Sequence, residues 1–564
     1  MASVCSMCTR SQFQKRLCNP RYSIYSFFIN PSKFFFSNCA IIYNLHYQKS
    51  NNALCQFFSK NHHIATGSRS QILQQEPFNL FSGLHNIAPV FYLRGEQIVI
   101  LDNPKEFYEE LKSRILSAKR RIFLAALYIG PTEKELVGFP CKKNSGCGIP
   151  TVNTIREALK KSSQLNVHIL VDYLRSTRVE LQGDGESSVT LLSPLVEEFP
   201  DQVTVSLYHT PNLTGILKQV MPSRINEGIG LMHIKAFGFD DDLILSGANL
   251  SHDYFTNRQD RYMIVKSVPA ITDYFAELLQ TIGKFSYTLS LNTIQNKFNI
   301  NCFDVPDPIT NSKVFKKRSS YMMKEFINKW IDFTRKHQNE IDTEFDTIIF
   351  PVTQMAPLNI RQDERATLCV LDSIEKNGRQ KMNENDLWTV IFSSGYFNFS
   401  KRYKEKILDT NAKFRLLAAA PEANGFFRSK GISKYIPPAY TLFEKQFYDE
   451  VRQRGKEDII KIMEYNRPAW TFHAKGLWCY TNGETRPSLT MIGSPNYGYR
   501  STERDLEAEI IIITKNASLK EDLHRESSRL SEHTEAVNAE TFQRPERKVP
   551  YLIRVATSII KTML

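Results

Sequence analysis

One pair of residues occurs twice in this chain, once in each half, and it constrains the fold more than any other feature. His233 and Lys235 lie in the segment HIKAFGFD, and His473 and Lys475 lie in HAKGLWCY. None of the other ten histidines is followed by a lysine two residues later. A single His-x-Lys arises by chance in a chain of this length, so only its repetition carries information.

The repetition extends beyond these two pairs. Each copy is followed by a Gly-containing turn with an asparagine, and an acid comes eleven residues after that asparagine: Asn249 and Asp260 in the first copy, Asn496 and Glu507 in the second. A matched order of His, Lys, Asn and acid predicts two related halves that share one fold.

Alternating strand and helix patterns support this duplication. Apolar β-type runs occur at 121–129, 165–173, 203–209, 232–239, 242–247 and 261–265, and again at 389–394, 413–419, 460–465, 471–480, 488–493 and 508–514. Helical patterns occur at 104–119, 152–162, 270–285, 400–409, 436–454 and 516–531. Strands that alternate with helices predict an α/β class. We expect two α/β/α sandwich lobes related by a pseudo-twofold axis, with the active site at their interface.

The predicted organisation has five parts. They are an N-terminal arm at 1–75, a first lobe at 76–290, a polar linker at 291–320, a second lobe at 321–540 and a C-terminal segment at 541–564.

The net charge of +13 resides mainly in the N-terminal arm. Residues 1–75 contain eight Lys or Arg and no acid, together with many Ser and Phe, which is typical of a mitochondrial transit peptide. A disordered basic arm is the alternative. The rest of the chain is only mildly basic, so its charge does not indicate a nucleic-acid partner.

The C-terminal segment is amphipathic. Its polar and basic residues lie on one side of a helix, and its apolar residues lie on the other. The apolar residues at helical spacing are Leu552, Val555, Ala556, Ile559, Ile560 and Met563. Such a segment either lies in a membrane interface or forms a last helix docked on the core.

The repeated residues suit phosphodiester chemistry. If the two copies meet, two imidazoles and two ammonium groups share one pocket, where one histidine attacks phosphorus and the other protonates the leaving oxygen. Side-chain donors after the strands are candidates for phosphate binding: Asn249, Ser494 and Asn496. Asp260 and Glu507 are candidates to accept from a ring nitrogen and orient a histidine.

Other features narrow the chemistry. Asp240 lies five residues after Lys235, where a turn or an ion pair is the simpler interpretation. The five cysteines after residue 75 are scattered, which indicates neither a disulfide framework nor a four-ligand zinc site. No GxxxxGK[ST] or GxGxxG loop occurs, so we expect no nucleotide cofactor. The metal-binding signature DGxxAR does not occur either, so we expect no metal in the chemical step.

These motifs resemble the phospholipase D superfamily, whose His-x-Lys-x4-Asp pattern matches His233, Lys235 and Asp240. The second copy has Tyr480 where that pattern has aspartate. More narrowly, the segments AALYIGPTEKELV, RINEGIG, SGYFNFS and PEANGFF, with both motif regions, are similar to eukaryotic mitochondrial phosphatidylglycerophosphate synthases over roughly residues 80–540.

The resemblance implies transfer of a phosphatidyl group from CDP-diacylglycerol to sn-glycerol 3-phosphate through a phosphohistidine, on the matrix face of the inner mitochondrial membrane, with peripheral membrane contact. It implies His233 as nucleophile and His473 as acid and base, although the symmetric chemistry permits the reverse. Candidates for the acceptor pocket, each also interpretable as a surface ion pair, are Arg178, Arg224, Glu227 and Arg258. The alternatives are a phosphatidylserine or cardiolipin synthase or a hydrolase of the same superfamily, or a non-catalytic lipid-binding protein.

Overall fold

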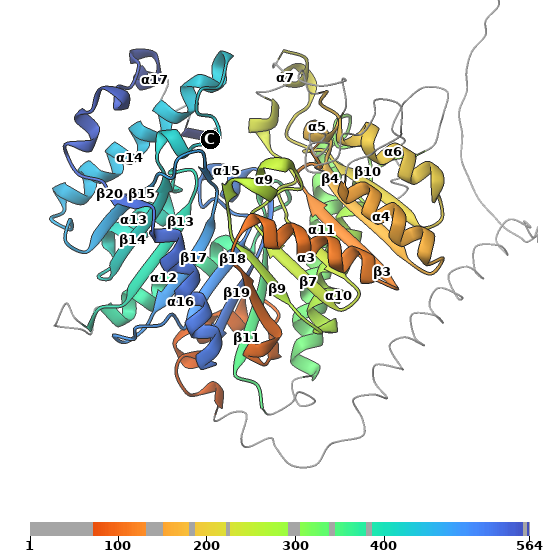
Figure 1. Ribbon diagram of the computed structural model, residues 1–564, viewed down its shortest axis with the longest axis horizontal. Helices are drawn as coiled ribbons and strands as arrows, with labels where there is room; N and C mark the ends of the chain where they lie inside the picture. Colours follow the sequence, from red (N-terminus) through yellow and green to blue (C-terminus); the bar gives the residue numbers. More distant parts are fainter. Residues whose placement is uncertain are drawn as a thin grey trace, which may run out of the picture. The chain divides into compact units, whose positions relative to one another are not determined.

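A computed structural model describes most of the chain after the N-terminal arm (Figure 1). The described residues are 72–130, 150–179, 187–220, 226–290, 305–337, 344–378, 386–555 and 561–562. The predicted transit peptide up to residue 71, Arg224, linker residues 291–304, and residues 556–560 and 563–564 of the C-terminal segment lie outside the described residues. Residues 65–564 form one compact unit.

The first half of the chain builds an eight-stranded sheet in the order β10-β5-β4-β3-β6-β7-β9-β2. Its strands are β2 Ile98–Leu101, β3 Arg121–Ala126, β4 Asn166–Asp172, β5 Val203–Tyr208, β6 Ala236–Phe239, β7 Asp242–Ser246, β9 Tyr262–Val265 and β10 Tyr287–Thr288. Its helices are α3 Pro104–Ser117, α4 Pro150–Lys161, α5 Tyr173–Ser176, α6 Ser188–Glu198, α7 Gly215–Val220, α9 His252–Thr256 and α10 Pro269–Gly283.

The second half builds a ten-stranded sheet along the path β1-β11-β19-β18-β17-β13-β14-β15-β20, with β12 paired to β11. Its strands are β1 Phe91–Leu93, β11 Thr347–Met355, β12 Ile360–Arg361, β13 Thr389–Ser394, β14 Lys413–Ala419, β15 Ile460–Tyr465, β17 Lys475–Tyr480, β18 Leu489–Gly493, β19 Leu506–Thr514 and β20 Thr534–Ala536. Its helices are α11 Ser312–Lys336, α12 Gln362–Gly378, α13 Lys401–Asp409, α14 Ile436–Gln453, α15 Tyr499–Glu503, α16 Ala517–Ser531 and α17 Tyr551–Val555.

The two sheets have the same strand order. From β3 the sheet continues in parallel through β4 and β5 on one side, and antiparallel through β6, β7, β9 and β2 on the other. From β13 it continues in parallel through β14 and β15, and antiparallel through β17, β18, β19 and β11. The predicted duplication and the α/β class are therefore confirmed.

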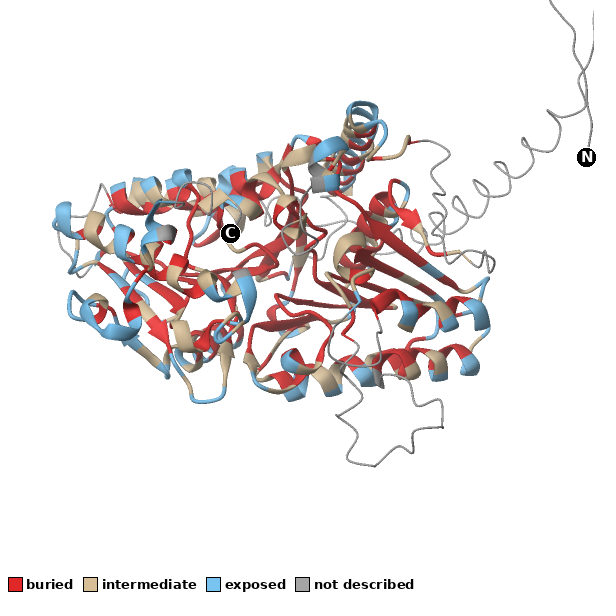
Figure 2. Cartoon of the chain, turned by 90° about the horizontal axis from the view of Figure 1, so that it is seen from above, coloured by how far each residue is buried: buried red, intermediate tan, exposed pale blue. Residues whose placement is uncertain are grey.

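Three hydrophobic clusters hold the layers together, and Figure 2 shows buried strands between outer helices. One cluster joins the first sheet to α3, α4 and α6, and another joins the second sheet to α12, α13 and α14. The third contains the inner faces of both sheets with α10, α11 and α16. Because this third core belongs to both halves, the lobes pack as one body.

A buried arginine also connects the lobes. Arg261, just before β9, donates to both carboxylate oxygens of Glu526 on α16 at 2.9 and 2.8 Å, and to the Met491 carbonyl at 2.6 Å. Its guanidinium lies 3.8 Å from the Trp478 ring centroid. Gly476 has φ +136°, and a Cβ there would lie 2.0 Å from Arg261 Nη1, so only glycine leaves room for this arginine.

Two predicted strands differ from the observed ones at their histidines. The 232–239 strand begins at Ala236, and the 471–480 run is interrupted between β16 (Thr471–Phe472) and β17. The interruptions carry His233 and His473, whose backbones bond to the opposite lobe instead of their own sheet.

Two elements do not follow the predicted domain limits. β1 lies within residues 76–290 but pairs with β11 of the second sheet. α11 begins at Ser312, inside the predicted linker.

Candidate active site

Each histidine of the repeated motif lies on a segment that crosses to the other lobe. Met232 forms a bridge to Leu506, and the backbone N–H of His233 donates to the Leu506 carbonyl at 2.8 Å. In the second copy, the N–H of His473 donates to the Gln259 carbonyl at 2.8 Å, next to the pairing of β16 with β8 (Arg258–Gln259). The lobe interface therefore fixes the position of both histidines.

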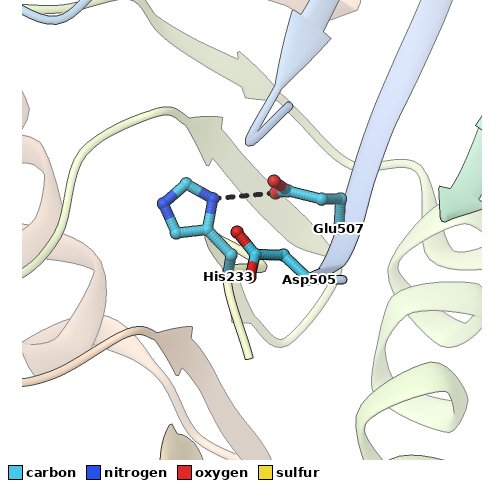
Figure 3. Close-up of side chains that lie close together, drawn as sticks. All are labelled: His233, Asp505 and Glu507. Atoms are coloured by element: carbon cyan, nitrogen blue, oxygen red, sulfur yellow. Dashed lines mark hydrogen bonds and ion pairs between the residues drawn. The ribbon is translucent and has the colours of Figure 1, made fainter. Parts of the chain in front are cut away.

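The acceptor residues beside those contacts are the two predicted carboxylates. Nδ1 of His233 donates to Oε2 of Glu507 at 2.8 Å, and Nδ1 of His473 donates to Oδ2 of Asp260 at 2.7 Å. Figure 3 shows the first pair, with Glu507 on β19 pointing at the imidazole of the other lobe. A carboxylate on Nδ1 fixes the tautomer and leaves Nε2 for chemistry.

The lysines lie against the histidines. Nζ of Lys475 lies 2.7 Å from Nδ1 and 3.0 Å from Nε2 of His473, and Nζ of Lys235 donates to the His233 carbonyl at 2.6 Å. Burial, together with these ammonium groups, lowers the pKa of both histidines well below the ordinary value. The imidazoles are therefore neutral near pH 7, as a nucleophile requires.

Burial also shifts the charged partners. It lowers the pKa of Lys475 to about 8 against the opposing effect of Asp260 and Glu507, and it raises the pKa of Asp260 to about 6 against the opposing effect of Lys475. It lowers the pKa of Lys235 and raises that of Glu507. An incoming phosphate anion would favour the charged form of both lysines, so the pocket suits an anionic ligand.

The predicted phosphate-binding residues line the same region but contact protein. Asn249 accepts from the Leu127 N–H at 3.2 Å and donates to the Tyr254 hydroxyl at 3.1 Å. Ser494 exchanges bonds with the backbone of Ala508 at 3.1 to 3.3 Å. Asn496 has a buried Oδ1 without a partner among the described residues. Direct phosphate binding by these three remains a prediction.

Asp240 lies away from the reactive nitrogens. It occupies the turn between β6 and β7 with φ +50°, and its carboxylate accepts from the backbone N–H groups of Lys119, Arg120 and Arg121 at 2.8 to 3.1 Å. Although partial burial opposes the shift, these donors lower its pKa. The geometry supports the turn interpretation for Asp240.

The acceptor-pocket candidates fall into two places. Arg178 and Glu227 form an ion pair with each other beside η5 (Glu227–Ile229). Arg258 lies close to His473: its guanidinium covers the Tyr254 ring at 4.6 Å and donates to Thr471 Oγ1 at 3.1 Å.

Sequence reasoning missed three contributors to the site. The Tyr254 hydroxyl lies 3.4 Å from Nε2 of His473, and Tyr396 packs edge-on against the same imidazole at 5.7 Å. Beside His233, Arg500 donates to Asp505 at 3.0 Å. Tyr254 follows Asn249 by five residues, but the repeat has Ser501 at that position, so the duplication gave no signal for it.

His233, Asp505 and Glu507 place three metal-type ligand atoms within 4.8 Å of one another. Their oxygens already have protein donors: Asp505 accepts from Leu231 N at 2.9 Å and from Arg500, and Glu507 accepts from Ser501 Oγ at 2.8 Å. The cluster is therefore better suited to orienting an imidazole than to holding a cation.

Comparisons with known proteins agree with this geometry. No family model matches the sequence. The chain is 39% identical over 508 residues to the mitochondrial CDP-diacylglycerol–glycerol-3-phosphate 3-phosphatidyltransferase of Gallus gallus, covering 85% of this chain and 86% of the relative. It is 37% identical to a probable enzyme of the same name from Dictyostelium discoideum, covering 89% and 83%. A phosphatidylserine synthase structure from Haemophilus influenzae matches the fold with TM-score 0.60 at 18% identity, covering 87% of this chain and all of that one. The chain belongs to the family of CDP-diacylglycerol–glycerol-3-phosphate 3-phosphatidyltransferases.

Proposed function

We propose that this protein transfers the phosphatidyl group of CDP-diacylglycerol to sn-glycerol 3-phosphate, giving phosphatidylglycerophosphate and CMP in the synthesis of phosphatidylglycerol and cardiolipin. The observation that carries the proposal is the pair of cross-lobe His–carboxylate contacts at 2.8 and 2.7 Å. The relatives that carry this enzyme name match the chain over most of their length, which supports it further.

The reaction proceeds in two displacements. Nε2 of His233 attacks the phosphorus that bears diacylglycerol, a P–N bond forms, and the bond from phosphorus to the CMP oxygen breaks. His473 takes up a proton on Nε2 once the substrate phosphates offset the lysine charges that help to lower its pKa, and it gives this proton to the departing CMP. The glycerol hydroxyl then attacks the phosphatidyl-histidine, its proton passes to His473, and the P–N bond breaks. Lys235 and Lys475 offset the charge on the non-bridging oxygens.

Glycerol 3-phosphate binds beside this centre. Arg258 supports the proposal because its guanidinium is packed against Tyr254, which contacts His473. Arg178 and Glu227, which form an ion pair beside η5, are further candidates: the arginine would offer charge to the acceptor phosphate and the glutamate an oxygen to a glycerol hydroxyl.

The protein acts at a membrane surface. Among the described residues, no helix is long and apolar enough to span a bilayer. We propose that the protein reaches its lipid substrate by peripheral contact. The mitochondrial names of the relatives and the acid-free N-terminal arm support a mitochondrial location, and we place the enzyme on the matrix face of the inner membrane.

The acceptor is tested by product analysis. Purified protein is incubated with CDP-diacylglycerol and, in parallel, with glycerol 3-phosphate, serine, phosphatidylglycerol or buffer alone. We expect phosphatidylglycerophosphate and CMP only with glycerol 3-phosphate. Use of serine or water without glycerol 3-phosphate would reject the assignment and leave the fold unaffected.

The covalent route is tested with the histidine variants. His233→Ala and His473→Ala should each abolish transfer, and the double variant should lose no more than either single one. In His473→Ala, a substrate with a better leaving group than CMP should leave an acid-labile phosphatidyl label on His233. Label on His473 in His233→Ala would reverse the roles, and inversion at phosphorus would exclude two displacements.

A further inference from the structure

We infer that the surface formed by α7, the segment 425–435, the start of α15 and α17 docks on an anionic phospholipid bilayer. This docking surface rests on the proposed function, because it supplies the route by which a bilayer lipid reaches the histidines. Figure 1 shows α7 and α17 at the same end of the molecule, at the top of the view.

The first observation is where apolar side chains are exposed. Among the described residues, nine large hydrophobic side chains are exposed, and six belong to this surface or adjoin it: Val179, Ile216, Phe427, Tyr499, Tyr551 and Val555. The other three lie on α11. Single exposed apolar residues are ordinary, but a group on one surface marks an interaction site.

Contacts tie these segments to the site. A Cβ on Gly425 would lie 3.2 Å from Arg258, so Phe427 is two residues from a neighbour of the His473 pocket. Tyr499 precedes Arg500, which bonds Asp505 beside His233. Arg178, next to Val179, pairs with Glu227 in the same loop whose Gly228 carbonyl accepts from Arg504 at 2.6 Å.

The C-terminal segment joins the same surface. Val549 and Ile553 are buried against Tyr440 and Phe443 of α14, whereas Tyr551 and Val555 face outward. In the described part of this segment, one side therefore docks on the core and the other side is exposed. The face turned away from α14 is the one that we assign to the bilayer.

Charge identifies the partner. The segment 426–435 contains Arg428, Lys430 and Lys434, all exposed, and no acid. Residues 548–555 contain exposed Lys548 and Arg554 and no acid. Exposed aromatic and aliphatic side chains beside cations suit anionic head groups above an acyl layer, because each basic residue adds attraction and each apolar one adds burial.

Vesicle binding of the full chain tests the surface. Sedimentation is measured with vesicles of phosphatidylcholine alone and of phosphatidylcholine mixed with phosphatidylserine. We expect strong binding to the anionic vesicles, weakened about tenfold by Phe427→Ser. Replacement of Arg428, Lys430 and Lys434 together by glutamine should weaken it roughly 100-fold, and added salt should remove the difference.

Phe333→Ser is the matched control. Phe333 is 39% exposed and Phe427 is 40% exposed, so both variants remove a similar ring. Phe333 is near the end of α11, where Thr334 Oγ1 accepts from the N–H of Val90, next to β1. β1 in turn pairs with the first residues of β11, whereas the active-site residue Glu507 pairs with Gln354 at the other end of that strand. Phe333→Ser should bind vesicles like the wild type.

The outcomes separate the two proposals. Transfer with a soluble short-chain CDP-diacylglycerol should be unchanged in Phe427→Ser, since the docking surface does no chemistry. Absence of that transfer in the wild type would reject the function and not the surface. The docking surface would be overturned if wild type and both surface variants bound vesicles equally, or if Phe333→Ser lost as much binding as Phe427→Ser. It would also be overturned if the protein did not bind vesicles and Phe427→Ser instead abolished its self-association.

Discussion

The ion pair between Arg261 and Glu526 predicts how strongly the lobe interface supports the site. Glu526→Gln removes the negative charge while keeping the side-chain shape. In the wild type, the Trp478 indole N–H donates to Glu526 at 3.0 Å. The variant places an amide NH₂ against either that indole N–H or the guanidinium. The arginine side chain has 0% exposure and the glutamate 1%, so water cannot replace the lost partner. Removal of one partner from a buried pair costs about 3–5 kcal/mol. The remaining Gln oxygen still accepts one bond, so we expect about 3 kcal/mol.

Urea unfolding followed by tryptophan fluorescence measures this cost, since Trp478 stacks on Arg261. The control is Glu521→Gln on the same helix, where the partner Arg486 is solvent-exposed and the change should be small. The backbone N–H of Arg261 donates to Oδ1 of Asp260 at 2.9 Å. The rate of phosphatidyl transfer should therefore also fall in Glu526→Gln, at temperatures where the chain remains folded. Equal free energies of unfolding for the two glutamine variants would refute the reasoning.

Three further predictions concern the site. The pKa of Lys475 is about 8, so the ammonium is lost as pH rises through that value and kcat/KM should fall above about pH 8. Lys475→Arg should move this fall in kcat/KM to higher pH. A wild-type kcat/KM that stays flat to higher pH would contradict the prediction. Asp260→Asn and Glu507→Gln should each lower kcat on the order of 10²- to 10⁴-fold with circular dichroism unchanged, because the imidazole loses its fixed tautomer. Tyr254→Phe should lower kcat about tenfold with KM unchanged, since it removes one hydrogen bond to His473; an equal rise in KM would assign the tyrosine to substrate binding instead.

Periodicity predicted most of the strands and helices because their apolar residues are buried on regular faces. The run at Thr389–Ser394 and the 269–283 helix lie where the pattern placed them. The long helix α11 was missed although its buried residues, Phe315, Ser319, Met323, Phe326 and Trp330, recur at helical spacing. Its many lysines and its polar start gave it the composition of a connector.

The repeat predicted the residues of the site but not which ones would meet. Asp260 and Glu507 were expected near a histidine, yet nothing local to either motif states that each acid crosses to the other lobe. That pairing depends on the backbone contacts of His233 with Leu506 and of His473 with Gln259, which are tertiary.

The crossing makes the histidine of each lobe depend on the other lobe for its position and orientation. Each acid lies one residue beyond the carbonyl that holds the histidine of the other lobe, so the contact that joins the lobes also orients the base. The two copies differ five residues after the asparagine, where the first has Tyr254 against Nε2 of His473 and the second has Ser501 bonded to Glu507. A phenol that accepts from a protonated Nε2 stabilises an imidazolium, which is the form that must protonate CMP. A serine that instead bonds the carboxylate leaves Nε2 of His233 to the substrate. We infer that this difference favours His473 as the acid and His233 as the nucleophile, and the label trapped in His473→Ala tests that assignment.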